Sequence, residues 1–228
     1  MDDDDTTYLE LADWRRRMAQ LYVEARTLQD IYSPAAAHDQ WRAVREQLYR
    51  EHPRSPIPPA RRANFAARHF AYDPALRFQV TVIPDTPAAD PTKRPDADDR
   101  GEPPARGTEA VPTSGGGTIG VRRVGWLDVS FPAGERRLGL YWLEGYAGGL
   151  YLPFRDRTNG AETYGGGRYL LDAAKSADLG GDPAAGTLTL DFNFAYHPSC
   201  AFDPRWVCPL VPPENALDIR VEAGERLT

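Results

Sequence analysis

Apolar residues in the first fifty positions recur at steps of three and four, the spacing of amphipathic helices. The apolar positions of a first helix over residues 6–29 are Leu11, Trp14, Met18, Leu21 and Ala25, and those of a second over residues 36–52 are Trp41, Val44 and Leu48. Pro34 separates the two helices and Pro53 ends the second. We expect an antiparallel helical pair that packs on the rest of the protein, followed by an extended connector and a short helix over residues 59–68.

From Leu76 onwards the pattern changes to alternation of apolar and polar residues, which is typical of β-strands. The predicted strands cover residues 77–82, 119–131, 137–145, 149–158, 161–171, 187–196 and 217–222. Residues 132–135 and the pair Asn159-Gly160 provide turn sequences for two hairpins. Strands without interleaved helices predict an α+β, mainly β fold, in which an antiparallel barrel or sandwich-like sheet follows the helical pair.

Two domains follow from this pattern: residues 1–75 form the helical pair and connector, and residues 76–228 form the antiparallel β domain. Residues 85–117 interrupt the second domain with six prolines and no aromatic residue. Such a segment buries too little apolar surface to offset the entropy of ordering. We therefore predict a disordered, solvent-exposed insertion there.

Polar side chains gather on one face of the predicted sheet. If Asn159-Gly160 is a two-residue turn, Tyr151 lies opposite Arg168, and Tyr164 shares their face. Asp191 and Asn193 form a similar polar side on the later strand. The face either is solvated or lines a pocket, and Arg168 either binds a ligand carboxylate or phosphate or pairs with Asp191.

The glycine run between Tyr164 and Arg168 has two interpretations. Backbone N–H groups in such a run can surround a phosphate, but the lysine and the strand-to-helix context of a phosphate loop are missing. A β-bulge or a close approach of two strands explains small residues better.

Cys200 and Cys208 lie close together in the sequence near His197 and allow four interpretations. They are packed thiols, a short-loop disulfide, a Cys200 nucleophile assisted by His197, or zinc ligands together with His197. The sequence has no CxxC pair and lacks a clear fourth metal ligand, so we predict neither a metal nor another cofactor.

Charge and hydropathy narrow the possible partners. The net charge of -6 disfavours binding to nucleic acids or anionic membranes, which requires clustered Lys and Arg. The chain contains no run of about 20 apolar residues, and its start, Met1 to Asp5, lacks the basic residues of a signal peptide. We expect a cytoplasmic protein with reduced cysteines; the sequence does not predict its oligomeric state.

Three long segments near the C-terminus resemble a known family. They are Thr163 to Leu170, Asp191 to Phe202, and Cys208-Pro209 with Pro212 to Asn215, and Ala223-Gly224-Glu225 closes the pattern. Together with Trp41-Arg42, Ser55 to Pro58 and Tyr72-Asp73, they resemble the bacterial and archaeal domain-of-unknown-function family 1684. The resemblance implies a shared fold and no established activity. That family usually has Asn where this chain has His197, so a catalytic or metal-binding His197 would be peculiar to this protein.

Three functions fit these observations. The first is binding of a small polar or anionic ligand in a pocket of a β-barrel-like domain. Its predicted ligand-binding residues are Tyr164, Arg168, Asp191, Asn193 and Asn215. The second is a small enzyme that uses Cys200 as a nucleophile or redox thiol, with His197 or Asp191 as base. The third is a structural or partner-binding module, which an exposed Trp14 or Trp41 would favour. Whether the protein is an enzyme stays open.

Overall fold

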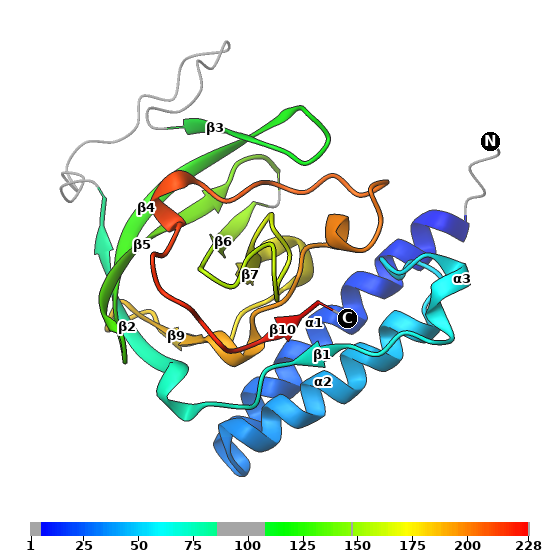
Figure 1. Ribbon diagram of the computed structural model, residues 1–228, viewed down its shortest axis with the longest axis horizontal. Helices are drawn as coiled ribbons and strands as arrows, with labels where there is room; N and C mark the ends of the chain where they lie inside the picture. Colours follow the sequence, from blue (N-terminus) through cyan, green and yellow to red (C-terminus); the bar gives the residue numbers. More distant parts are fainter. Residues whose placement is uncertain (1–5, 86–107, 147, 228) are drawn as a thin grey trace.

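Two long helices begin the computed structural model, which describes residues 6–85, 108–146 and 148–227 (Figure 1). Helix α1 spans Thr6–Ile31 and helix α2 spans Pro34–Glu51, which confirms the predicted pair. The second helix starts two residues earlier than predicted, because Ser33 caps it by accepting a hydrogen bond from the Ala36 N–H (3.1 Å) and Pro34 is tolerated in the first turn. Helix α3 is shorter than expected and covers Pro59–Arg62.

A curled antiparallel sheet forms the main body and confirms the predicted fold class. Its strands are β2 (Arg77–Pro84), β3 (Thr108–Pro112), β4 (Thr118–Phe131), β5 (Gly134–Leu143), β6 (Gly149–Phe154), β7 (Arg168–Asp172), β8 (Gly181–Asp182) and β9 (Thr187–Asp191). They are ordered β7-β6-β5-β4-β2-β9-β8, and β3 pairs with β4. The sheet curls into a half-barrel, and the helical pair lies along one side of it (Figure 1).

Short 3₁₀ turns and a small ribbon connect the sheet to the helices. The turns are η1 (Pro74–Leu76), η2 (Ala173–Lys175), η3 (Phe192–Phe194), η4 (Ser199–Ala201) and η5 (Pro213–Asn215). The ribbon pairs β1 (Arg68–His69) with β10 (Glu225–Arg226). It runs beside α2 in Figure 1, so the C-terminal segment lies between the half-barrel and the helices.

The hairpin predicted at Asn159-Gly160 is wrong. Phe154 lies opposite Arg168 and Tyr151 opposite Asp172, so residues 155–167 form a compact loop instead of continuing the strands. The Asn159 side chain stabilises this loop by accepting a hydrogen bond from the Asp156 N–H (2.5 Å) and donating one to the Tyr164 carbonyl (2.6 Å). These bonds inside the loop replace the cross-strand bonds that the prediction required.

Two further predictions change. The strand expected over residues 217–222 is an irregular segment, held by isolated bonds such as Leu217 N–H to the Arg155 carbonyl (2.7 Å) and Arg157 N–H to the Ile219 carbonyl (2.9 Å). Of the predicted insertion, residues 86–107 lie outside the described residues. Thr108 to Pro112 form β3, because Val111 is buried against the body.

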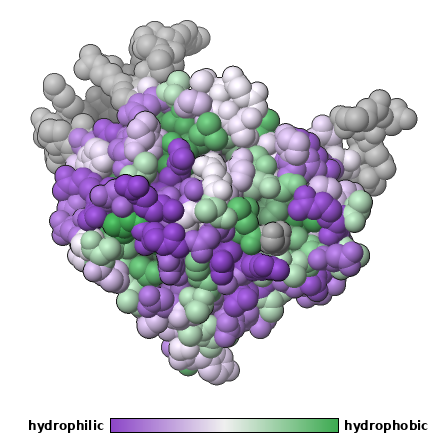
Figure 2. All heavy atoms as spheres, in the orientation of Figure 1, coloured by the Kyte–Doolittle hydropathy of each residue, from purple (hydrophilic) through white to green (hydrophobic). Residues whose placement is uncertain are grey.

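Buried residues form two clusters. One joins the apolar faces of α1 and α2 to sheet residues such as Tyr141 and Tyr151, and the other joins the opposite face of those strands, at Leu140 and Leu152, to residues 217–223. Trp14 and Trp41 belong to the first cluster and are 7% and 1% exposed, so neither favours the partner-binding alternative. Figure 2 shows hydrophilic residues spread between apolar ones over the face in view. Within the described part of the chain, no helix combines the length and hydropathy that crossing a membrane requires.

Candidate functional site

The predicted ligand residue Arg168 is fully buried and serves as a cross-link. Its guanidinium pairs with Asp156 (Nη2 to Oδ1, 3.2 Å) and donates to the carbonyls of Val221 (2.9 Å) and Ala223. Asp156 in turn accepts the Val221 N–H (2.8 Å). The charged pair therefore fastens the irregular C-terminal segment to strand β7, and Arg168 does not pair with Asp191 as one alternative held.

Asp191 and Asn193 lie together at the end of β9, where they form a turn. Asp191 Oδ1 accepts hydrogen bonds from the N–H and the Nδ2 of Asn193 (3.0 and 2.8 Å). Asn193 also binds the backbone of Asp73, accepting its N–H at 2.9 Å and donating to its carbonyl at 2.8 Å. Burial raises the pKa of Asp191, although the hydrogen bonds from Asn193 and the charge of Arg77 oppose part of this rise. These polar groups hold η3 against the chain near η1.

Asn215 is the fourth predicted ligand residue whose polar groups bind backbone. Its Oδ1 accepts the Gly139 N–H (2.7 Å), and its Nδ2 donates to the carbonyls of Gly139 (2.9 Å) and Pro153 (2.8 Å). The side chain thus connects η5 to strands β5 and β6. The predicted role of Arg168, Asp191, Asn193 and Asn215 in ligand binding stays a prediction, and none of the four lines the cavity described below.

Tyr164, His197 and Cys200 do come together. The Tyr164 hydroxyl lies 3.8 Å from Cys200 Sγ, and the Tyr164 N–H donates to His197 Nε2 (3.1 Å). With Nε2 accepting this bond, the ring proton is on Nδ1, which lies 3.9 Å from Glu225 Oε2. Burial lowers the pKa of His197 to about 4, and its only basic lone pair is occupied. This geometry does not suit a general base for Cys200 or a metal ligand.

A cavity of about 290 Å³ lies between helix α1, the sheet and the loop over residues 199–209. We call it the helix–sheet cavity. Its lining includes Leu11, Trp14 and Arg15 of α1, Arg54 and Pro56 of the connector, Ile119, Leu143, Tyr151 and Tyr169 of the sheet, Asp172 and Lys175 at η2, and Ser199, Trp206, Val207, Cys208 and Pro209. Its size is at the lower end of ordinary small-molecule pockets, and its walls are mostly apolar with a few polar groups.

The loop over residues 199–209 forms one wall of this cavity and is held by tyrosines from the sheet. Tyr151 and Tyr169 both donate their hydroxyl hydrogen bonds to the Pro209 carbonyl, the former at 3.2 Å. Their rings meet edge to face with centroids 5.1 Å apart. Burial raises the pKa of both phenols well above the ordinary value, so they are neutral donors that shape the wall.

Positive charge dominates the polar part of the helix–sheet cavity. Arg15, Arg54 and Lys175 line it, against the single carboxylate of Asp172. That carboxylate is already engaged, since it accepts the Tyr196 hydroxyl (2.8 Å) and lies 3.8 Å from Lys175 Nζ. Neither arginine has an acidic partner among the residues that the structure describes.

Two buried donors at this cavity also lack partners. Arg54 Nε and Trp206 Nε1 have no hydrogen-bond partner within residues 6–85, 108–146 and 148–227. Buried N–H groups are nearly always paired in folded proteins, because an unpaired one costs about 1–3 kcal/mol. Both residues line the helix–sheet cavity, so an acceptor bound there would offset that cost.

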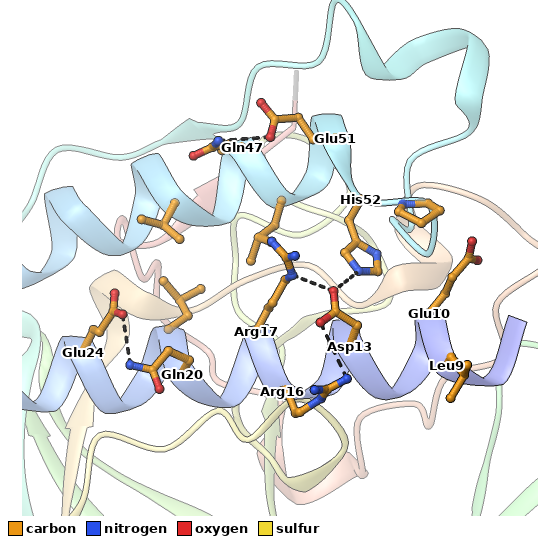
Figure 3. A pocket seen from close by; sticks show the side chains of 14 residues that line it. Leu9, Glu10, Asp13, Arg16, Arg17, Gln20, Glu24, Gln47, Glu51 and His52 are labelled. Carbon is orange, nitrogen blue, oxygen red and sulfur yellow. Dashed lines mark hydrogen bonds and ion pairs between the residues drawn. The ribbon is translucent and has the colours of Figure 1, made fainter. Parts of the chain in front are cut away.

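A larger groove of about 650 Å³ lies on the outer side of the helical pair (Figure 3). Its charged groups satisfy one another: Asp13 contacts His52 (3.2 Å), Arg17 (2.6 Å) and Arg16 (3.8 Å). Figure 3 shows these side chains turned towards Asp13 and Gln20 paired with Glu24. The charges around Asp13 are thus paired with one another, and we do not treat this groove as the functional site.

Metal chemistry has no support in the geometry. No group of three His, Cys, Asp or Glu side chains within the described residues is arranged to hold a metal ion. Sequence reasoning missed Arg54, Lys175 and Trp206, which lie in irregular segments where no periodicity marks a shared face. The density of Trp, Pro and Cys residues between Ser199 and Pro209 was the one signal that pointed to this region.

Comparisons with known proteins agree with the fold. The model of a family described as "Protein of unknown function (DUF1684)" matches residues 65–226. Among solved structures, the chain is similar to an uncharacterized protein of Haloarcula marismortui determined by solution NMR. The two share 29% sequence identity and superpose with a TM-score of 0.57 over 88% of this chain and 97% of the other. No curated protein matches the chain.

Proposed function

This chain belongs to the DUF1684 family of proteins of unknown function, and we propose that this member binds a small organic anion in the helix–sheet cavity. The observation that carries the proposal is Arg54, a cavity-lining arginine with a buried, unpaired Nε and no acidic partner among the described residues. A guanidinium binds carboxylates and phosphates through charge-assisted hydrogen bonds. The proposal keeps the small anionic ligand expected from the sequence and moves the site.

The cavity walls support a ligand with an apolar body. Trp14, Leu143 and Tyr151 provide apolar surface, and Arg54, Arg15 and Lys175 provide positive charge. Lys175 is held over the ring of Tyr196 at 4.9 Å from its centroid, which fixes its position near the cavity. We therefore infer a small monocarboxylic acid, with its chain or ring against the apolar wall and its carboxylate at Arg54.

Thermal-shift and calorimetric titrations with hexanoate, benzoate and inorganic phosphate test this proposal, with hexanamide and benzamide as neutral counterparts. The carboxylates are expected to raise the melting temperature, because a ligand that binds only the folded state stabilises it by mass action. The amides should bind at least about tenfold more weakly, since a hydrogen bond to a charged group contributes about 1.5–3 kcal/mol and one to a neutral group only about 0.5–1.5 kcal/mol. Equal binding of acids and amides, or no binding of either, would contradict the proposal.

Arg54→Gln is the decisive variant. It should weaken carboxylate binding about tenfold or more while leaving the melting temperature of the free protein nearly unchanged, because Arg54 Nε has no hydrogen-bond partner to lose among the described residues. Arg157→Gln is the matched control. Arg157 is exposed, lies outside the cavity lining and makes one 3.3 Å bond to the Asp218 carbonyl. Its replacement should leave binding unchanged.

A further inference from the structure

Cys200 and Cys208 are brought together by the turn η4 and the loop that follows it. The Cys200 N–H donates to Cys208 Sγ (3.4 Å), so the turn places the two cysteines next to each other. Cys208 is fixed from the other side, because its N–H donates to Ser114 Oγ (3.0 Å) and its carbonyl accepts the Ser114 N–H (2.9 Å). The folded chain therefore holds two free thiols side by side.

The two thiols differ in exposure. Cys200 is half-buried and lies next to the Tyr164 hydroxyl, whereas Cys208 is 8% exposed. Hydrogen bonds from Cys208, Ser114 and Tyr164 lower the pKa of the Cys200 thiol to about 6, and the proton that Cys208 shares with Cys200 raises the pKa of Cys208. Cys200 is thus the more acidic and the more accessible thiol of the pair.

We propose that Cys200 and Cys208 form a peroxide-sensitive dithiol that cycles between two thiols and an intramolecular disulfide. The geometry carries this inference: the backbone N–H of the more accessible cysteine donates to the sulfur of the second cysteine, whose own backbone is fixed by Ser114. The pair does not depend on anion binding. It needs no base from His197, whose Nε2 is engaged by Tyr164.

The reaction has two steps. The Cys200 thiolate attacks one oxygen of a hydroperoxide ROOH; the S–O bond forms, the O–O bond breaks, and the leaving RO⁻ takes a proton to become ROH. The sulfur is oxidised to the sulfenic acid and the peroxide is reduced. The Cys208 thiol then attacks that sulfur, the S–S bond forms, and the hydroxide leaves as water with the Cys208 proton. Two equivalents of a small thiol reduce the disulfide and become a disulfide themselves.

The test treats the full chain with hydrogen peroxide, alkylates the remaining thiols with a maleimide under denaturing conditions and measures the intact mass. Wild type should lose both alkylation sites and regain them after treatment with dithiothreitol. Peptide mapping should find a Cys200–Cys208 disulfide. Retention of both alkylation sites, or a sulfinic or sulfonic acid in place of the disulfide, would overturn the proposal.

Two single variants separate the roles of the thiols. In the Cys208→Ala variant, oxidation by peroxide should stop at the Cys200 sulfenic acid, which dimedone traps. It should also slow iodoacetamide alkylation of Cys200 near neutral pH by about tenfold, because the hydrogen bond that stabilises the thiolate is lost. Cys200→Ala should leave Cys208 unreactive to peroxide. Circular dichroism confirms that both variants fold, and equal reactivity of the two cysteines in the single variants would contradict the assignment.

Discussion

Arg45 on helix α2 and Glu225 on strand β10 form a buried two-pronged ion pair between segments 180 residues apart in the sequence. Arg45 Nη1 and Nη2 lie 3.0 Å from Glu225 Oε1 and Oε2, and both side chains are at most 2% exposed. Glu225 also accepts the His197 N–H (2.7 Å). Burial raises the pKa of this carboxyl, but the charge and hydrogen bonds of Arg45, together with the charges of His197 and His69, outweigh burial and lower the pKa to about 2.

Removing one member of this pair should be costly. Glu225→Gln leaves the Arg45 charge buried without compensation and is expected to lower the free energy of unfolding by about 3–5 kcal/mol in urea titrations. The matched control is Asp128→Asn, which removes a similar two-pronged pair with Arg137 (2.6 and 2.7 Å) at the surface. That change should cost about 0–1 kcal/mol. Equal losses in the two variants would show that burial does not set the cost.

Two buried histidines, His38 and His197, and the half-buried His69 predict acid sensitivity. Burial lowers the pKa of His38 and His197 to about 4 and that of His69 to about 3, against an ordinary value of 6.5. Below pH 6.5 the unfolded chain therefore binds more protons than the folded one. The stability that the neutral histidines contribute should be complete above pH 6.5. Between pH 6.5 and 4 the free energy of unfolding should fall by up to about 1.4 kcal/mol per pH unit for each histidine.

Urea titrations of wild type and His38→Phe across this pH range test whether the histidines cause the fall in the free energy of unfolding with pH. The slope of that free energy against pH is the quantity compared. The ring of His38 packs against Trp41, Tyr72 and Phe194, so phenylalanine fits the same surroundings without a titrating group. The variant should lose about one third of the slope, because one of the three proton-binding groups is gone. An unchanged slope would exclude His38 as a contributor.

Asn215 should behave as a structural residue. Asn215→Ala leaves the Gly139 N–H and the Gly139 and Pro153 carbonyls without their partner. Each buried group left unpaired costs about 1–3 kcal/mol, so urea titration should show a loss of at least about 3 kcal/mol. Asn64→Ala, at an exposed position, is the control and should stay within about 0.5 kcal/mol. A fully stable Asn215→Ala protein would restore Asn215 as a candidate ligand residue.

The glycine run before Arg168 contains one position that requires glycine and one that does not. Gly167 has φ +98°, and an added Cβ would lie 2.7 Å from the Phe154 carbonyl oxygen. At Gly165 the nearest atom to an added Cβ is 3.9 Å away. Gly167→Ala should therefore lower the free energy of unfolding by about 1–3 kcal/mol or more, and Gly165→Ala by less than about 0.5 kcal/mol. Thermal or urea unfolding of the two variants provides the comparison.

The helices and most strands could be predicted because each repeats one period over many residues. Trp14, Met18 and Leu21 recur at helical steps, and all three are buried. The C-terminal segment has no such repeat. Its backbone is held by side chains such as Arg168 and Asn215 and by single bonds to loop residues, and sequence periodicity carries no information about these contacts.

Ligand-binding residues are harder to recognise in the sequence than helices and strands, for a chemical reason. The side chains that bind a small anion, Arg and Asn, are also those that bind backbone carbonyls and N–H groups inside a fold. Arg168 and Arg54 therefore look alike in the sequence. Both terminal nitrogens of Arg168 have hydrogen-bond partners and only its Nε lacks one, whereas the Arg54 side chain has no partner among the described residues. Only the three-dimensional arrangement separates them.

Residues 217–225, which fasten the half-barrel to helix α2, also set the order in which the protein can fold. Val221 and Ala223 are fully buried and receive the donors of Arg168, and Glu225 holds α2 against the body. While the ribosome still encloses residues 221–225, Arg168 of strand β7 lacks its backbone acceptors at Val221 and Ala223. Arg45 of α2 lacks its buried counter-ion, Glu225. Synthesis of the helices and sheet therefore precedes closure of the core, and the apolar surfaces of the nascent chain stay exposed to aggregation until residues 221–225 leave the ribosome.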